Sequence, residues 1–286
     1  MKIATGWVDY EVIATGSGEK LERWKDVYLL RPDPQIIWKN KNDLSKYKNL
    51  NAHYLRSSSG GGKWNIIKPI PEEWIVSYKS LNFSIKPMGF KHTGLFPEQA
   101  SNWDLMMELI SKANRPIKVL NLFAYTGGAT VACASAGASV CHVDCVKQIV
   151  ERAKKNAELS NLKDANIRYI VDDCKKFVER EIRRGNKYDA IIMDPPSFGR
   201  SGNSTVWKLE EDLFDFVNLC KEILTEKPLF VLINSYTTGI GATVSENILR
   251  ICLKEKAGTF CSYEIGLPTQ EGIILPCGFS AIYIGE

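Results

Sequence analysis

The order of apolar and amphipathic segments after residue 100 restricts the fold of this chain more than any other feature. Seven short apolar runs have the composition of buried strands, at residues 118–123, 139–144, 167–171, 188–193, 229–234, 260–266 and 279–284. Helical spacing of apolar residues occurs between the first six of them, at residues 129–136, 147–161, 174–184, 210–222 and 245–255. This repeated order predicts an α/β domain with a doubly wound, mostly parallel sheet of seven strands. No helix separates the last two strands, which indicates an antiparallel edge.

Residues 1–80 have a different texture. They contain short apolar and aromatic runs, interrupted by Pro32, Pro34 and a flexible Ser and Gly stretch at 57–62, and they lack a long helical period. These features predict a small β-rich module with loops. Its aromatic side chains, Trp64, Trp74 and Tyr78 among them, are assigned to packing. We therefore predict two domains, a β-rich module over residues 1–80 and an α/β domain over residues 81–286.

Composition sets limits on partners and location. Lys and Arg number 37 against 33 Asp and Glu, a net charge of +4, which permits a polyanionic partner without requiring one. Eight cysteines contain no C-x-x-C pair and only three histidines accompany them, so we expect free thiols and no metal site. The chain shows no leader pattern at its amino terminus and no apolar run of membrane-spanning length. We expect a cytoplasmic protein without a membrane association.

An apolar run at residues 189–193 is followed by the carboxylate residue Asp194 and by a rigid corner formed by Pro195 and Pro196. Neither proline can donate a backbone hydrogen bond, so the chain must leave the sheet at this point. Ligands of open α/β sheets bind beyond the carboxyl ends of strands, where such a corner offers only acceptors to an amino group or ring edge. The alternative is a solvated turn.

The first strand of the sheet runs into a glycine turn, Asn121 to Ala129, and then into a helix of small residues. This is the layout in which a cofactor meets a helix amino terminus. A G-x-G-x-x-G fingerprint is absent and only Gly127 and Gly128 allow close backbone approach. The turn therefore favours a cofactor whose carboxylate and amino group bind to it, and it disfavours NAD and FAD.

Acidic side chains follow the next two strands. Asp144 stands about twenty residues after the turn, where a carboxylate accepts hydrogen bonds from ribose hydroxyls. After the third strand, Asp173 is placed to receive an exocyclic amine such as that of adenine. Helix capping is the competing role for both, and we expect one residue of the Asp172 and Asp173 pair to serve it.

These features, in this order, resemble class I S-adenosylmethionine-dependent methyltransferases, and in particular the ribosomal RNA large-subunit methyltransferase I/K group. The matching segments are His92 to Gln99, Leu120 to Gly128, Asp194 to Gly199, Val206 to Lys208 and Leu275 to Gly278. The resemblance covers roughly residues 85 to 286. It implies a Rossmann-like fold, S-adenosylmethionine as the cofactor, and RNA as the substrate, with ribosomal RNA as the expected class.

The resemblance also implies roles for individual residues. Residues from the segment before the first strand, from the turn and from the strand ends would contact the cofactor: Phe96, Glu98, Gln99, Asn121, Phe123, Tyr125, Gly127, Gly128, Asp144, Asp173 and Asp194. Asn121 stands where many methyltransferases carry an acidic residue near the cofactor amino group. Phe123 and Tyr125 replace glycines of the commoner fingerprint, and packing is an equal alternative for them.

Methyl transfer requires an oriented nucleophile and a held cofactor, without a catalytic metal. Relatives that methylate carbon 5 of cytosine use a cysteine after the next strand, where this chain has Asn234. We therefore expect a nitrogen or oxygen target, oriented by Asp194 and the carbonyl of Pro195 in the double-proline corner with Pro196. Phe198 would stack on a flat substrate or plug the loop. Cys174, Cys220 and Cys277 are interpreted as buried filler.

The leading hypothesis is a methyltransferase acting on RNA. The alternatives are a small-molecule or protein methyltransferase, and a non-catalytic module that binds S-adenosylmethionine. The basic run at residues 180–187 would follow a nucleic-acid backbone or complement a helix dipole, and Lys208 would meet a phosphate or begin a helix in solvent. The methylated atom and the oligomeric state are left open.

Overall fold

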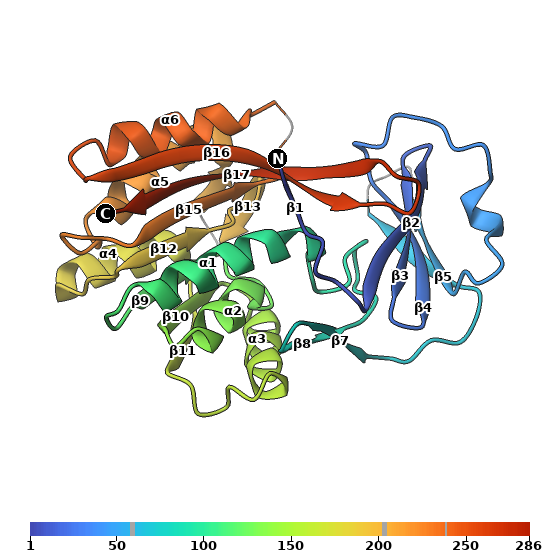
Figure 1. Cartoon of the computed structure of the whole chain (residues 1–286), viewed down its shortest axis with the longest axis horizontal. Helices are drawn as coiled ribbons and strands as arrows, with labels where there is room; N and C mark the ends of the chain where they lie inside the picture. The colour runs from blue at the N-terminus through green and yellow to red at the C-terminus, as the bar shows by residue number, and fades with distance from the viewer. Residues whose placement is uncertain (58–60, 202–204, 238) are drawn as a thin grey trace. The chain divides into compact units, whose positions relative to one another are not determined.

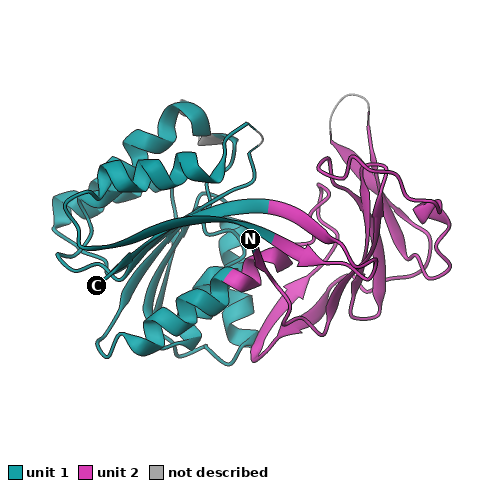
Figure 2. Cartoon of the chain, turned by 45° about the horizontal axis from the view of Figure 1, so that its top comes forward, with its two compact units in different colours: residues 1, 102–265, 278–286 teal, residues 2–101, 266–277 magenta. Residues whose placement is uncertain are grey.

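The computed structural model describes all residues except 58–60, 202–204 and 238. The predicted flexible stretch at 57–62 falls in part on residues outside this description. The chain divides into two compact units (Figure 2), unit 1 with residues 1, 102–265 and 278–286, and unit 2 with residues 2–101 and 266–277. The units thus divide after residue 101, and unit 2 includes a second segment of the chain. The predicted domain boundary at residue 80 stays a prediction.

Unit 1 is built on the predicted sheet. Its strands are β9 (Lys118–Leu122), β10 (Ser139–Asp144), β11 (Ile167–Val171), β12 (Ala190–Met193), β15 (Phe230–Ser235), β16 (Gly258–Pro268) and β17 (Ile274–Gly285). They lie in the order β16-β17-β15-β12-β9-β10-β11, and the two-residue strand β1 (Lys2–Ile3) precedes β16 at the edge. The pairs among β9, β10, β11, β12 and β15 are parallel, whereas β15 and β17 are antiparallel. The doubly wound fold with an antiparallel edge is confirmed.

Six helices of the described chain accompany these strands. They are α1 (Ala100–Lys112), α2 (Gly128–Ser135), α3 (Lys147–Leu159), α4 (Cys174–Arg184), α5 (Leu209–Lys221) and α6 (Ala242–Cys252). Figure 1 shows α1, α2 and α3 on one face of the sheet and α4, α5 and α6 on the other. Helix α1 was not among the predicted helices, although Trp103, Met106 and Ile110 are buried at helical spacing. The hairpin of β13 (Phe198–Ser201) and β14 (Thr205–Lys208) was not predicted either.

A hydrophobic core of unit 1 lies between the sheet and α4, α5 and α6. Apolar side chains of the central strands, among them Leu120, Ile191 and Val231, pack against Phe177 and Phe216 of these helices. Central strands of a parallel sheet are covered on both faces, so they consist of nearly continuous apolar residues. Burial of this core fixes the strand ends, and with them the positions of the residues that follow each strand.

Unit 2 is β-rich, as expected for the amino-terminal part. Its five-stranded sheet has the order β2 (Tyr10–Gly16), β3 (Glu19–Trp24), β4 (Val27–Pro32), β5 (Ala52–Arg56) and β6 (Gly62–Ile66). A hairpin follows, made of β7 (Trp74–Tyr78) and β8 (Leu81–Ile85), and short 3-10 turns occur at Leu44–Lys46 and Pro97–Gln99. Tyr78 is buried, and the indole N–H groups of Trp64 and Trp74 donate to backbone carbonyls of Met88 and Trp24. These contacts agree with a packing role.

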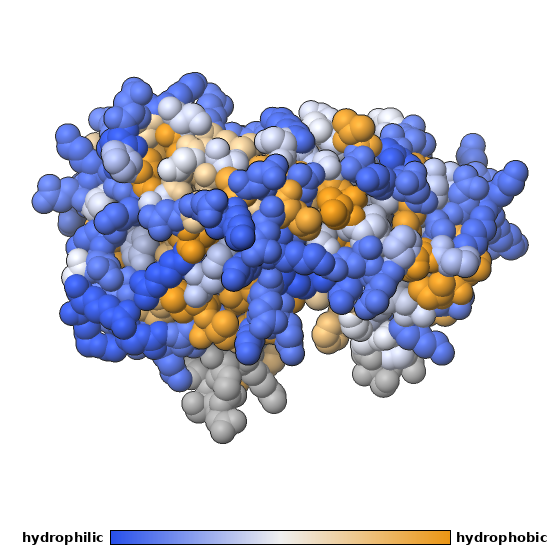
Figure 3. All heavy atoms as spheres, turned by 90° about the horizontal axis from the view of Figure 1, so that it is seen from below, coloured by the Kyte–Doolittle hydropathy of each residue, from blue (hydrophilic) through white to orange (hydrophobic). Residues whose placement is uncertain are grey.

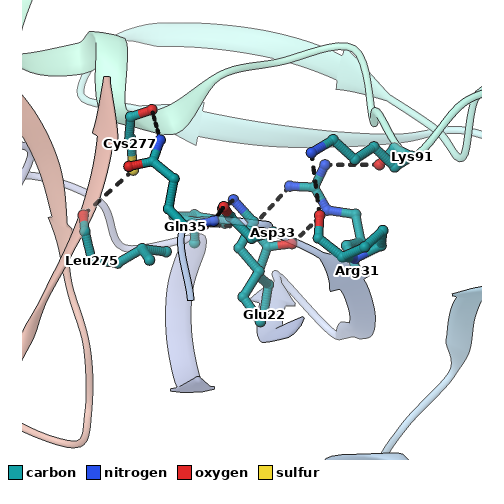
Figure 4. Close-up of polar contacts among 10 residues, drawn as sticks. Glu22, Arg31, Asp33, Gln35, Lys91, Leu275 and Cys277 are labelled. Atoms are coloured by element: carbon teal, nitrogen blue, oxygen red, sulfur yellow. Dashed lines mark hydrogen bonds and ion pairs between the residues drawn. The ribbon is translucent and has the colours of Figure 1, made fainter. Parts of the chain in front are cut away.

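A buried ion pair organises the interior of unit 2 (Figure 4). Arg31 donates from Nε and Nη2 to the two carboxylate oxygens of Glu22, at 2.6 and 2.9 Å, and from Nη1 to the carbonyl of Lys91. The hydroxyl of Tyr10 donates to the same carboxylate at 2.6 Å. Burial opposes the charge of Glu22, but Arg31 and Lys20 overcome it and lower the pKa of Glu22 to about 2. Glu22 therefore stays ionised and paired with Arg31 inside unit 2.

The described surface is mostly polar, with apolar side chains in separate groups on the face seen in Figure 3. No helix among the described residues is both long and apolar enough to cross a membrane. All eight cysteines are free thiols, and Cys145 and Cys261 are the exposed ones.

Candidate cofactor and substrate site

The turn after β9 has three left-handed residues in alternation. Phe123, Tyr125 and Gly127 have φ angles of 54°, 49° and 82°. Non-glycine residues rarely adopt this conformation, and aromatic residues pay a steric cost for it. Phe123 and Tyr125 thus adopt the conformation that glycine adopts most readily, at the positions where the resemblance implies replaced glycines. The sequence shows which residues stand there, and only the structure shows that they are left-handed.

Gly127 and Gly128 have no space for a larger side chain. A Cβ atom on Gly127 would lie 2.8 Å from the Cβ of Ala153 on α3, and one on Gly128 would lie 2.7 Å from the indole ring of Trp103 on α1. Gly128 begins α2, and the N-cap residue Gly127 makes no side-chain hydrogen bond to the first turn of this helix. The two glycines therefore let α2 start close to its neighbours.

Gly127→Ala is expected to destabilise the fold by about 3 kcal/mol, through left-handed strain plus overpacking against Ala153. Urea unfolding measures the loss. The matched control is Gly137→Ala, which has a φ of 92° but no atom within 4 Å of the added methyl group. It should cost about 1 kcal/mol, the conformational part alone. Equal losses in the two variants would contradict the packing argument.

Asp144, at the end of β10, is joined to the turn. Its Oδ2 accepts from the backbone N–H of Tyr125 and its Oδ1 from that of Val146, each at 3.0 Å. Burial raises the pKa of this carboxyl group against the opposing effect of these hydrogen bonds. Asp144 thus holds the strained turn, and the predicted ribose contact remains a prediction.

Asp173 caps α4, since its Oδ1 accepts from the backbone N–H of Lys176 at 2.9 Å. Its neighbour Asp172 forms an ion pair with Arg180. The expectation that one of the two aspartates caps the helix is therefore met by Asp173, the residue also predicted to receive adenine. A carboxylate has several acceptor positions, so one capping bond does not exhaust it.

A pocket lies at this edge of the sheet. It is lined by residues at or after the ends of β9, β10, β11 and β12 and in the β13 and β14 hairpin: Phe123, Asp144, Cys145, Asp173, Cys174, Lys175, Pro196, Gly199 and Trp207. Four strand ends thus contribute to one cavity, as expected for an open α/β sheet. Sequence reasoning did not assign Cys145, Lys175, Gly199 or Trp207 to the site, and it interpreted Cys174 as buried filler. Cys145, Cys174 and Lys175 stand next to predicted residues or to one another, whereas Gly199 and Trp207 lie in segments that resemble the methyltransferase group.

The double-proline corner follows β12, whose neighbour in the sheet is β9. The backbone N–H of Asp194 donates to the carbonyl of Leu122 at 3.4 Å, which sets the carboxylate beside the end of β9. Further along, Ser197 Oγ lies 2.5 Å from Thr237 Oγ1 in the loop after β15. Phe198 is 55% exposed, so it does not serve as a plug beneath the loop. Stacking on a flat substrate stays a prediction.

Comparison with known proteins identifies the family. A model described as S-adenosylmethionine-dependent methyltransferase matches residues 39–244, more than half of the chain. The chain belongs to this family of S-adenosylmethionine-dependent methyltransferases. The predicted family and cofactor are confirmed.

Individual relatives agree with this assignment. A solved S-adenosylmethionine-dependent methyltransferase from Agrobacterium tumefaciens is 33% identical with a TM-score of 0.92, over 98% of this chain and 92% of that one. Ribosomal RNA large subunit methyltransferase I of Aeromonas salmonicida is 34% identical over 110 residues, 38% of this chain and 27% of that protein. Ribosomal RNA large subunit methyltransferase K/L of Shewanella oneidensis is 34% identical over 144 residues, 50% of this chain and 18% of that protein. The match thus spans less than a third of either curated relative.

In this methyltransferase Asn121 is buried within β9. Its Nδ2 donates to Thr130 Oγ1 at 2.9 Å, and this oxygen lies 2.9 Å from Nδ1 of His142. Burial lowers the pKa of His142 to about 3, so the imidazole is neutral. Asn121 is therefore fixed to α2 and β10 from behind the turn, and its predicted cofactor contact stays untested.

Asn234, at the position where a relative that methylates carbon 5 of cytosine would carry its cysteine, is also held by hydrogen bonds. Asn234 is buried at the end of β15 and its Oδ1 accepts from Asn102 at 3.1 Å and from Ser280 at 2.7 Å, while Tyr263 donates to Asn102. This closed polar network satisfies a buried amide. Asn234 has a structural role in this network, with no nucleophilic atom.

Phe96, Glu98 and Gln99 belong to unit 2, at the 3-10 turn Pro97–Gln99. Glu98 and Gln99 are buried, and burial raises the pKa of Glu98. Phe96 is half-buried, with its ring centroid 5.4 Å from that of His92. Their predicted contact with S-adenosylmethionine remains a prediction.

Proposed function

We propose that this chain transfers a methyl group from S-adenosylmethionine to a nitrogen or another directly nucleophilic atom of RNA, with ribosomal RNA as the expected class. The observation that carries the proposal is the shared pocket, in which Pro196 of the double-proline corner meets Asp144 and Asp173 of the cofactor side. A substrate held at Asp194 would lie next to the cofactor. In-line transfer needs this proximity above all.

Three buried thiols support direct attack over a covalent intermediate. Burial raises the pKa of Cys174, Cys220 and Cys277 above that of an ordinary thiol. Cys174 accepts a hydrogen bond from the backbone N–H of Phe123 at 3.3 Å, which gives it a packing role at the turn. Nucleophilic cysteines are thiolates in electropositive, accessible sites. None of the three has that environment.

The names of the curated relatives and the distribution of charge support an RNA substrate. Unit 2 contains 15 Lys and Arg against 11 Asp and Glu, whereas unit 1 contains 22 of each, which accounts for the chain totals of 37 and 33. The net charge of +4 therefore lies entirely in unit 2. Phosphate contacts contribute much of RNA affinity, so we assign the RNA backbone to unit 2. Lys208 is paired with Glu211 at 2.8 Å and is not needed for this assignment.

Mass spectrometry of RNA nucleosides tests the proposal. A strain without the gene should lack one methylated nucleoside, and the wild-type chain should restore it, whereas a chain with Asp194→Ala should not. A complete set of methylated nucleosides in the deleted strain would contradict the RNA substrate and favour the small-molecule or protein alternative. Absence of any affinity for S-adenosylhomocysteine in isothermal titration would contradict methyl transfer itself.

The free thiols lead us to place the protein in a reducing cytoplasm.

A further inference from the structure

Trp207 contacts the double-proline corner through its indole N–H. Nε1 donates to the carbonyl oxygen of Pro196 at 2.7 Å. The pyrrolidine ring already fixes φ of Pro196, and the hydrogen bond holds the orientation of its carbonyl group, so both backbone dihedral angles of this residue are restrained. The path of the chain from Asp194 to Phe198 is thereby set.

The same side chain contacts the cofactor turn. The Trp207 ring lies 5.3 Å from that of Phe123 in the turn and 5.5 Å from that of Phe216 on α5, and Phe123 and Phe216 are 5.6 Å apart. These are the distances of favourable aromatic pairs. Trp207 therefore joins the substrate corner to a residue that also lines the cofactor pocket.

The hairpin after the corner has a glycine opposite this indole. Gly199 in β13 is the cross-strand partner of Trp207 in β14. A Cβ atom on Gly199 would lie 3.3 Å from the Pro196 ring and 3.8 Å from Cβ of Trp207. The backbone N–H of Leu209 closes the base of the hairpin by donating to the carbonyl of Ser197 at 3.1 Å. The glycine opposite Trp207 thus lets β13 pack closely against the Pro196 ring, whose carbonyl accepts the indole hydrogen bond.

We propose that Trp207 is a positioning residue, which holds the Asp194 to Phe198 corner in register with the cofactor turn. This inference rests on the proposed function for its effect on catalysis, but its effect on the corner does not depend on the substrate. The indole N–H orders the corner before substrate arrives, which reduces the ordering cost of reaching the reactive geometry.

Trp207→Phe tests the proposal because it removes the N–H and keeps an aromatic ring. Hydrogen exchange of the Ser197, Phe198 and Gly199 amides should become about fivefold to tenfold faster, the effect of losing one hydrogen bond. The kcat for methyl transfer to RNA from the gene-deleted strain should fall by a similar factor. The Kd for S-adenosylhomocysteine should stay within about threefold of the wild-type value. The matched control is Phe214→Leu, which shortens an exposed aromatic side chain of α5 and should leave exchange and kcat within about twofold.

Two results would overturn the inference. One is wild-type exchange at the three amides in Trp207→Phe, and the other is a parallel loss of cofactor affinity, thermal stability and kcat, which would mark a general structural role. If the RNA is not a substrate, the exchange and S-adenosylhomocysteine measurements still decide the question. Failure of the proposed function is therefore distinguishable from failure of the positioning role.

Discussion

Asp194→Ala is expected to lower methyl transfer at least about a hundredfold, while S-adenosylhomocysteine affinity stays within a few fold. The variant removes the carboxylate that we propose orients the nucleophile, but it keeps the backbone hydrogen bond from residue 194 to Leu122, which holds the corner beside β9. Misplacement of a reacting group by about 1 Å suffices for a loss of this size. Single-turnover transfer of a labelled methyl group to RNA from the gene-deleted strain measures the rate, and isothermal titration measures the affinity.

The matched control is Asp215→Ala, which removes an exposed carboxylate on α5 and leaves the corner unchanged. It alters the net charge by the same amount, so it should reproduce any general electrostatic effect on RNA binding. Turnover by Asp194→Ala at the rate of this control would reject the orienting role. A loss of cofactor affinity equal to the loss of rate would instead assign Asp194 to the cofactor.

Glu22→Ala is expected to destabilise unit 2 by about 3 to 5 kcal/mol, because it leaves the buried guanidinium of Arg31 without its carboxylate. Urea unfolding of the full chain measures the change. The comparison variant combines Glu22→Leu with Arg31→Met and replaces both charges by apolar groups, so it should recover much of the loss. A double variant as unstable as Glu22→Ala would show that the damage comes from altered packing.

The same carboxylate gives unit 2 a pH dependence. Its pKa is about 2 in the fold against an ordinary value of 4.5. The stabilisation is therefore present above about pH 4.5 and is lost as the pH falls toward 2, by about 3 kcal/mol in all. Unfolding measured between these pH values should show this slope in the wild type and a flatter one in the Glu22→Leu and Arg31→Met double variant. Equal slopes would assign acid sensitivity to other groups.

The sheet was predictable because each central strand is a continuous apolar run. When a helix separates such a run from the next run, a buried parallel strand is the structure that fits both. The predicted bounds of β10, β11 and α4 agree with the structure. Helix α1 and the β13 and β14 hairpin were missed, since local spacing alone does not reveal which face of a short segment becomes buried. The division into units depends on the second segment, residues 266–277, which joins unit 2 through contacts distant in sequence.

The order of the site residues was readable from the sequence because each one follows a strand, and parallel strands bring their carboxyl ends to one edge. The left-handed conformation of Phe123 and Tyr125 was not readable, because it depends on hydrogen bonds such as the one from Tyr125 to Asp144. The sequence by itself determined the fold class, the family resemblance and the carboxylate at the corner. The tertiary structure decided that Asp173 caps α4, that Asn234 is tied into a buried network and that Trp207 reaches Pro196. Such contacts arise only when segments far apart in the chain are packed together, which no local pattern of residue types encodes.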